Sequence, residues 1–295
     1  MSITGRIYLA AALILFSSSC VAATAELSWV GCDISKAAYV SDLADMFQQQ
    51  TGTNIELRTG NSSSGIRDVV TGTADIGSST RYLLPGDTRE TGIELVPVAW
   101  DALTIIVHKD NPVKNISLDQ LRAIYTGKIT NWSRLGGNDH EIEVLIHQQD
   151  NSAAGSTLRE ILFSDAGKKI SASRTIDSSV PLETVLQENP HAIAITGISS
   201  AHQHDVRIIS LDNVTPTIEN IKSGDYSLYR TLYLSYNPNS SKLESIKSFI
   251  SYINSKSGRD LMRANGVVPY REAMRLIMKK VYENEASYPL TVDKS

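Results

Sequence analysis

Strand-like and helix-like segments alternate along most of the chain, which predicts an α/β protein with a mainly parallel sheet flanked by helices. Two observations carry this prediction. An apolar strand pattern at residues 27–31 is followed by an amphipathic helix pattern at 37–50. Three further strand-like stretches, at 55–57, 74–76 and 143–147, each run into a loop rich in polar residues and Ser. Ligands of such sheets bind at the carboxyl ends of the strands, so these loops are candidate site segments.

The remaining segments continue the pattern. Residues 93–107 contain two apolar strands with Asp101 between them, and a helix over 117–125 opens with Ser117 as its N-cap. Further strands are predicted at 192–196, 206–211 and 228–236, and further helices at 241–254, 258–264 and 271–285.

Composition narrows the class of protein. The chain has 295 residues, of which 41% are hydrophobic and 20% charged, as in ordinary globular proteins, and its length allows two domains. Its net charge of −4 is spread without long runs. Nucleic acid is therefore not expected as a partner.

Residues 1–25 have the pattern of a cleavable signal peptide. Arg6 precedes an apolar stretch at 7–16 that is too short for a permanent anchor, and small residues favour cleavage after Ala25. A lipoprotein signal ending at Cys20 is the less favoured alternative, because the usual aliphatic residue three positions earlier is missing. Cleavage after Ala25 would leave Cys32 as the single cysteine, so no intrachain disulfide is expected. We predict an exported, periplasmic protein.

Two serine runs lie within residues 58–82. The run at 61–65 precedes a helical stretch, with Ser63 or Ser64 as its predicted N-cap, and the run at 77–81 adds Arg81. A helix start offers unpaired N–H groups and the positive end of the helix dipole, which suits an oxyanion. A third polar loop follows at 148–157. Ordinary turns remain the alternative reading of each run.

The chain lacks the usual signs of catalysis or metal binding. It has no G-x-S-x-G elbow and no phosphate-binding P-loop, and no His or acid is paired in the sequence with the loop serines as a base. His202 and His204 could suit a metal, but a solvated loop is the favoured interpretation. We predict no enzyme activity, no metal and no cofactor.

Several longer segments resemble the phosphate-binding members of the periplasmic substrate-binding proteins that serve ABC transporters. They are residues 96–101 (VPVAWD), 121–132 (LRAIYTGKITNW), 216–226 (PTIENIKSGDY) and 266–269 (GVVP). The resemblance runs through nearly all of the chain after residue 25, and it implies a two-lobed type II periplasmic-binding-protein fold. Two crossover strands would act as the hinge. It implies residues 26–101 and 227–295 in lobe I and residues 102–226 in lobe II.

The resemblance also implies a ligand site between the lobes, and a monomer that delivers phosphate or a related oxyanion to an inner-membrane ABC permease. The family's ligand loops correspond here to residues 31–35, 62–65, 79–81 and 152–157. The implied ligand-binding residues are Ser35, Ser63, Ser64, Gly65, Ser79, Thr80, Arg81, Ser152, Gly155, Ser156 and Thr157.

Two departures from the family pattern keep a second hypothesis open. The fourth loop lacks the family's Arg, because the strand ends in His147, Gln148 and Gln149, and Thr80 stands where some phosphate binders have Asp. We expect Arg81 to supply the missing charge. The alternative is a secreted relative with an altered ligand that acts as a sensor or surface-interaction protein.

Overall fold

The structure, a computed structural model, describes residues 26–84, 86–148, 156–177 and 180–287. Its strands are β1 (Glu26–Gly31), β2 (Asn54–Thr59), β3 (Ile76–Ser79), β4 (Glu94–His108), β5 (Asn115–Ile116), β6 (Glu143–His147), β7 (Arg174–Ile176), β8 (Ala192–Gly197), β9 (Val206–Leu211), β10 (Tyr229–Tyr236) and β11 (Val268–Pro269). Its α-helices are α1 (Asp33–Ser35), α2 (Ser41–Thr51), α3 (Ser62–Val70), α4 (Leu118–Tyr125), α5 (Ser156–Phe163), α6 (Leu182–Gln187), α7 (Ile198–Ala201), α8 (Ile218–Ser223), α9 (Leu243–Ile253), α10 (Lys256–Ala264) and α11 (Met274–Ser287).

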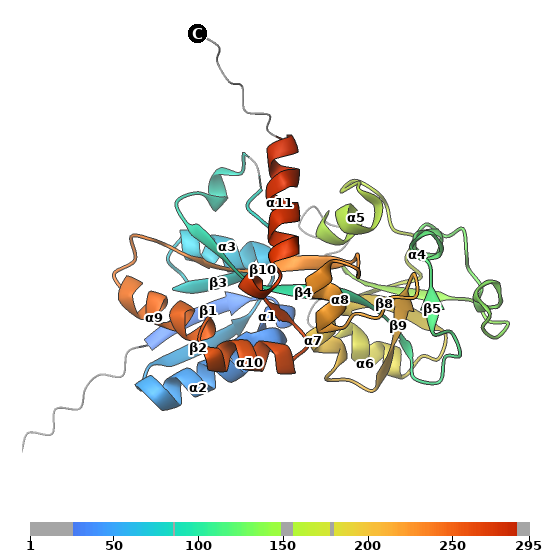
Figure 1. The fold of residues 1–295 in the computed structure, drawn as a ribbon, viewed down its shortest axis with the longest axis horizontal. Coiled ribbons are helices and arrows are strands. Elements are labelled where there is room, and N and C mark those ends of the chain that lie inside the picture. Colours follow the sequence, from blue (N-terminus) through green and yellow to red (C-terminus); the bar gives the residue numbers. More distant parts are fainter. Residues whose placement is uncertain (1–25, 85, 149–155, 178–179, 288–295) are drawn as a thin grey trace, which may run out of the picture.

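The strands follow the order β2-β1-β3-β10-β4-β8-β6-β7, which places two sets of parallel strands on either side of β10 and β4. In the first half β1 pairs in parallel with β2 and β3, and in the second half β6 pairs in parallel with β7 and β8. The two middle strands run antiparallel to their neighbours. Figure 1 shows the halves side by side, with α2, α3, α9 and α10 on one and α4 to α8 on the other.

Strand β4 crosses between the halves as one continuous strand, so the prediction of two strands separated at Asp101 is wrong. Its first part pairs with β10, and its second part, from Leu103 onward, pairs with β8 and β9. Asp101 needs no turn because it is fully buried and paired with Arg230, which lies opposite it in the register of β10. The predicted lobe boundaries fall within β4 and just before β10, and they stay predictions.

The C-terminal helices pack onto the first half, although they follow the second half in sequence. The aromatic ring of Phe47 on α2 lies 5.2 Å from that of Phe249 on α9, centroid to centroid. Asn265, which ends α10, donates a hydrogen bond of 3.1 Å to the carbonyl of Ala38. Burial of these apolar and aromatic groups explains why the chain returns to the half where it began.

The second half is held by strands that are buried on both faces. Ile105 and Ile106 on β4 point to opposite faces of the sheet, and both are fully buried, as is Ile193 on β8. The predicted capping of α4 is confirmed, because the Ser117 hydroxyl accepts from the N–H of Gln120. In the part of the chain that the structure covers, no helix combines the length and apolar character that crossing a membrane would require.

Candidate functional site

A cavity of about 480 Å³ lies between the two halves, where several strands end. Cys32 follows β1, Thr80 follows β3, and His147 ends β6. Its lining from the first half includes Cys32, Asp33, Lys36, Asp42, Asn61, Ser62, Thr80 and Arg230, and from the second half His147, Thr157, Glu183, Thr196, Ser200 and His204. The carboxyl ends of the sheet strands thus form the site, as the strand-helix pattern predicts.

Helix α3 begins with Asn61 as its N-cap, so the prediction of Ser63 or Ser64 in that role is wrong. The Asn61 side-chain oxygen accepts from the N–H groups of Ser63 at 2.9 Å and Ser64 at 3.1 Å. The Ser64 hydroxyl in turn accepts from the Asn61 N–H at 2.7 Å. This reciprocal pair is a capping box, so both serines contribute to the start of the helix.

Ser62 and Thr80 form a pair of hydroxyls on the cavity wall. Their oxygens lie 3.1 Å apart, and the N–H of Thr80 donates to the Ser62 hydroxyl at 3.0 Å. Both residues line the cavity, Ser62 in the first turn of α3 and Thr80 just after β3. They offer neutral donors to an anion, beside the positive end of a helix dipole.

Gly65 lets α3 approach β3 closely enough to form this pair. A Cβ atom at Gly65 would lie 2.0 Å from the carbonyl oxygen of Ser78, a separation that real Cβ atoms do not show. The Ser235 hydroxyl donates to the Gly65 carbonyl from β10. Gly65 therefore positions Ser62 over Thr80, and it does not line the cavity itself.

Arg81 is absent from the cavity lining and binds a carboxylate. Its two terminal nitrogens donate to the two oxygens of Glu90 at 2.8 Å and 2.7 Å, and one also donates to the Ser63 hydroxyl at 3.1 Å. Arg81 is only 7% exposed and the Glu90 side chain is fully buried. The expectation that Arg81 supplies the charge for the ligand is therefore replaced by a structural role, since a bidentate pair commits the guanidinium.

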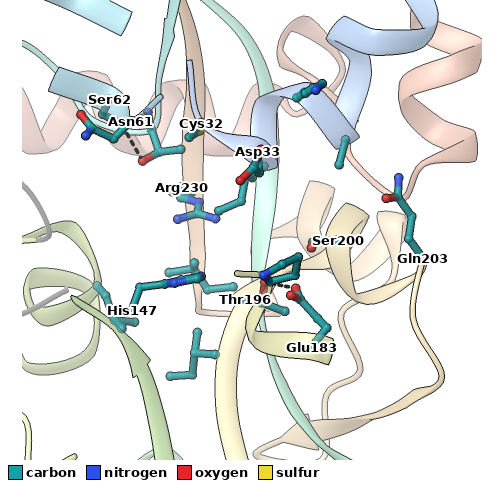
Figure 2. Close-up of a pocket in the computed structure, with 18 of the residues that line it drawn as sticks. Cys32, Asp33, Asn61, Ser62, His147, Glu183, Thr196, Ser200, Gln203 and Arg230 are labelled. Atoms are coloured by element: carbon teal, nitrogen blue, oxygen red, sulfur yellow. Dashed lines mark hydrogen bonds between the residues drawn. The ribbon is translucent and has the colours of Figure 1, made fainter. Parts of the chain in front are cut away.

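Arg230, on crossover strand β10, is the guanidinium that lines the cavity. Its Nε donates to Asp101 at 3.0 Å, and its side chain is 11% exposed. Burial raises the pKa of Asp101, and the neighbouring guanidinium opposes that rise only in part. In Figure 2 the guanidinium lies between the Asn61 and Ser62 side of the site and the Thr196 and Glu183 side.

The eleven site residues expected from the sequence divide into three groups. Thr80 and Thr157 line the cavity. Ser35, Ser63, Ser64, Gly65, Ser79 and Arg81 are absent from its lining. Ser152 and Gly155 lie outside the described residues, and Ser156 is described only as the first residue of α5.

The serines that lie off the cavity wall have partners inside the protein. The Ser79 hydroxyl donates to the Arg81 carbonyl at 2.8 Å, and Ser63 accepts from Arg81. Ser35 is fully buried, with its hydroxyl 3.5 Å from the sulfur of Cys32. These groups build the loops that carry the site.

Sequence reasoning missed Arg230, Glu183 and Thr196 as site residues. Thr196 and Arg230 are inside strands, and Glu183 is in the short helix α6. A carboxylate in the middle of an apolar strand, Asp101, was the one signal available, because a buried acid requires a cationic partner somewhere in the fold. That signal does not say which of the chain's basic residues is the partner.

Both signs of charge meet in the cavity. Asp33, Asp42 and Glu183 line it together with Lys36 and Arg230. Among the described residues no group of three or more His, Cys, Asp or Glu side chains is arranged to hold a metal ion. His204 lines the cavity with its Nδ1 2.8 Å from the Ser200 carbonyl oxygen, and His202 is outside the lining.

The fold and this inter-lobe cavity define a two-lobed, type II periplasmic-binding-protein architecture. A family model described as a PBP superfamily domain matches residues 28–257, and the chain belongs to that family. The relatives that it matches place it in a substrate-binding, non-enzymatic protein family.

Named relatives agree with the sequence resemblance. The phosphate-binding protein PstS of Bacillus subtilis is 25% identical over 256 residues, which cover 84% of this chain and 81% of the relative. A crystal structure of a putative phosphate ABC transporter substrate-binding protein with bound phosphate, from Clostridium perfringens, is 29% identical with a TM-score of 0.71, covering 83% of this chain and 99% of that one. An ABC-type phosphate transport receptor from Vibrio cholerae is 26% identical with a TM-score of 0.60, covering 83% and 99%. The chain is thus a distant, PstS-like member of the family.

Proposed function

We propose that the protein captures phosphate, or a similar tetrahedral oxyanion, in the cavity between its lobes. The observation that carries this proposal is that Arg230 lines the same cavity as the hydrogen-bonded hydroxyls of Ser62 and Thr80. The buried guanidinium of Arg230 would supply positive charge to the anion. The Ser62 and Thr80 hydroxyls and the N-terminus of α3 would supply hydrogen bonds that replace those the anion loses with water. The names of the relatives that bind phosphate support the same ligand.

The delivery step follows from the same family. A protein with the signal peptide predicted at residues 1–25 would act in the periplasm as a monomer and pass its ligand to an inner-membrane ABC permease. Lobe closure about β4 and β10 would bury the anion, because these two strands join the halves. The relatives described as ABC transporter proteins support this partner.

Calorimetry tests the proposal directly. The chain from Glu26 onward is unfolded, freed of ligand, refolded and titrated with phosphate, arsenate and sulfate. We expect phosphate to bind, and Arg230→Gln to weaken that binding by about 30-fold or more, since the variant removes a buried charge partner. Arg207→Gln is the matched control, because Arg207 bonds the Lys109 carbonyl outside the cavity lining and should bind phosphate as the wild type does.

The fold of each variant is checked by its unfolding midpoint. A folded Arg230→Gln protein with unchanged phosphate affinity would remove Arg230 from the site. A refolded wild-type protein that binds none of the oxyanions would overturn the proposed ligand.

A second candidate function is a sensor or surface-interaction protein with an altered ligand. The cavity acids favour it, because Asp33 and Asp42 would repel a dianion. A wild-type protein that binds no oxyanion, and that retains no partner permease in a membrane pull-down, would support this alternative.

A further inference from the structure

Glu183 is a buried carboxylate on the cavity wall whose charge is unbalanced. The residue is 2% exposed and lies in the first turn of α6. Among the described residues its hydrogen-bond donor is the Thr196 hydroxyl, and no cation forms an ion pair with it. Figure 2 shows the carboxylate beside Thr196, with the bond between them dashed. A carboxylate removed from water costs free energy unless a cation or further donors meet it.

The other charges of the cavity do not balance Glu183. Arg230 is already paired with Asp101 at 2.9 Å. Among the lining residues that the structure describes, carboxylates outnumber Lys and Arg. A ligand with negative charge alone would therefore leave the charge of Glu183, on the second half of the site, uncompensated.

The size of the cavity leaves room for more than one ion. Its volume of about 480 Å³ falls within the roughly 300–1,000 Å³ typical of pockets for drug-sized ligands. The oxyanion donors Ser62 and Thr80 belong to the first half, and Glu183 and Thr196 belong to the second. One ligand could therefore reach an anion site on one half and an acid on the other.

We infer that the cavity binds a zwitterion that carries an oxyanion and an ammonium group, such as an aminoalkylphosphonate. Its oxyanion contacts Ser62, Thr80 and Arg230, and its ammonium group binds the Glu183 carboxylate. This inference rests on the proposed oxyanion-binding function and names the substrate class. An ammonium group provides both the charge and the donors that Glu183 lacks, because it has three N–H groups and no acceptor.

Two matched phosphonates test the inference. 2-Aminoethylphosphonate and ethylphosphonate differ in the amine, and each is titrated calorimetrically into the refolded wild-type protein. We expect the aminated compound to bind about 30-fold more tightly, the scale of a buried charge pair. Equal affinities would overturn the inference, and this comparison needs no variant.

Glu183→Gln then assigns the preference to one side chain. The variant should bring the ratio of the two affinities close to one, because the ammonium group loses its charged partner while ethylphosphonate loses a nearby negative charge and should bind more tightly. General damage to the site would instead weaken both compounds. Glu188→Gln, at an exposed position just after α6, is the matched control and should keep the wild-type ratio. A Glu183→Gln protein that keeps the full preference would also overturn the inference.

Phosphate is titrated in the same series, so that the two proposals fail separately. Phosphate binding together with equal phosphonate affinities leaves the proposed function standing and removes the zwitterion. Tight 2-aminoethylphosphonate binding without phosphate binding supports the zwitterion and removes phosphate as the ligand. Binding of none of the three compounds overturns both.

Discussion

Two buried arginine-carboxylate pairs occupy different places in this protein and serve different ends. Arg81 and Glu90 form a bidentate pair in the first half, outside the cavity lining. Arg230 and Asp101 join the two crossover strands, and Arg230 lines the cavity. The Arg81–Glu90 pair, called the clamp below, therefore holds a loop in place. The Arg230–Asp101 pair leaves a cation on the cavity wall. The difference lies in whether the fold leaves the guanidinium facing a cavity.

The pairs also differ in how their carboxyl groups respond to the protein. Burial acts to raise the pKa of Glu90, but hydrogen bonds from the Arg81 side chain and the Leu84 N–H outweigh it, so that pKa is lowered. For Asp101 burial prevails over Arg230, and the pKa is raised. Hydrogen bonds and nearby positive charge therefore offset the cost of burial for Glu90 and do not offset it fully for Asp101.

Removing the guanidinium of the clamp should have the largest effect on stability. Arg81→Ala leaves Glu90 buried, with Arg67 at 3.5 Å as its remaining ion-pair partner. We expect a loss of about 3–5 kcal/mol in the free energy of unfolding, the usual cost of breaking a buried pair. Urea denaturation measures it. Calorimetry on the folded protein should show nearly unchanged phosphate affinity, and a selective loss of affinity would return Arg81 to the site.

Releasing Arg230 from its carboxylate should tighten the binding of oxyanions. Asp101→Asn removes the negative charge that compensates Arg230, so phosphate affinity should rise by about tenfold, or about 1.4 kcal/mol. Calorimetry measures the rise. Glu90→Gln is the matched control, because Arg81 does not line the cavity. An equal gain in both variants would show a general effect of net charge in place of a local one.

The free energy of unfolding below neutral pH should depend in opposite ways on the carboxyl groups of Glu90 and Asp101. A group whose pKa is lowered by folding stabilises the fold above its unfolded pKa, and this stability is lost as pH falls through the folded value. Glu90→Gln should therefore flatten the loss of stability in acid. Asp101 has the opposite sign, because its folded pKa is raised and its contribution fades as pH rises through that value. Asp101→Asn should steepen the acid loss, as measured by urea unfolding from about pH 7 to about pH 3. If the free energy of unfolding changed with pH in the same way in both variants, the expected difference between Glu90 and Asp101 would be wrong.

The smallest effect expected is a contrast between adjacent serines. Ser62 lines the cavity, whereas Ser63 accepts a hydrogen bond from Arg81. Ser62→Ala should lower phosphate affinity by about 0.5–1.5 kcal/mol, and Ser63→Ala should lower stability by a similar amount with affinity unchanged. Calorimetry and urea denaturation on both variants check the contrast, and a reversal would place Ser63 in the site.

The local sequence determined most of the elements and placed the candidate site at strand ends that line the cavity. Periodicity and turn residues located the strands and helices on which the cavity depends, including α4 with its Ser117 cap. The rule that ligands bind at strand ends selected the loops that carry Ser62, Thr80 and Thr157. These features can be predicted from the sequence because each depends on residues that are close together in the chain.

The tertiary structure alone decided which charged groups face the cavity. Arg81 and Arg230 both follow a strand pattern or lie within one, and only the pairing of β10 with β4 places Arg230 against Asp101 and the cavity. Glu183 on α6 and Thr196 on β8 are 13 positions apart in the sequence, and a hydrogen bond joins them. A charged side chain can be paired inside the protein or can face the cavity. Which of these happens depends on residues elsewhere in the sequence, because burial and pairing are properties of the whole fold.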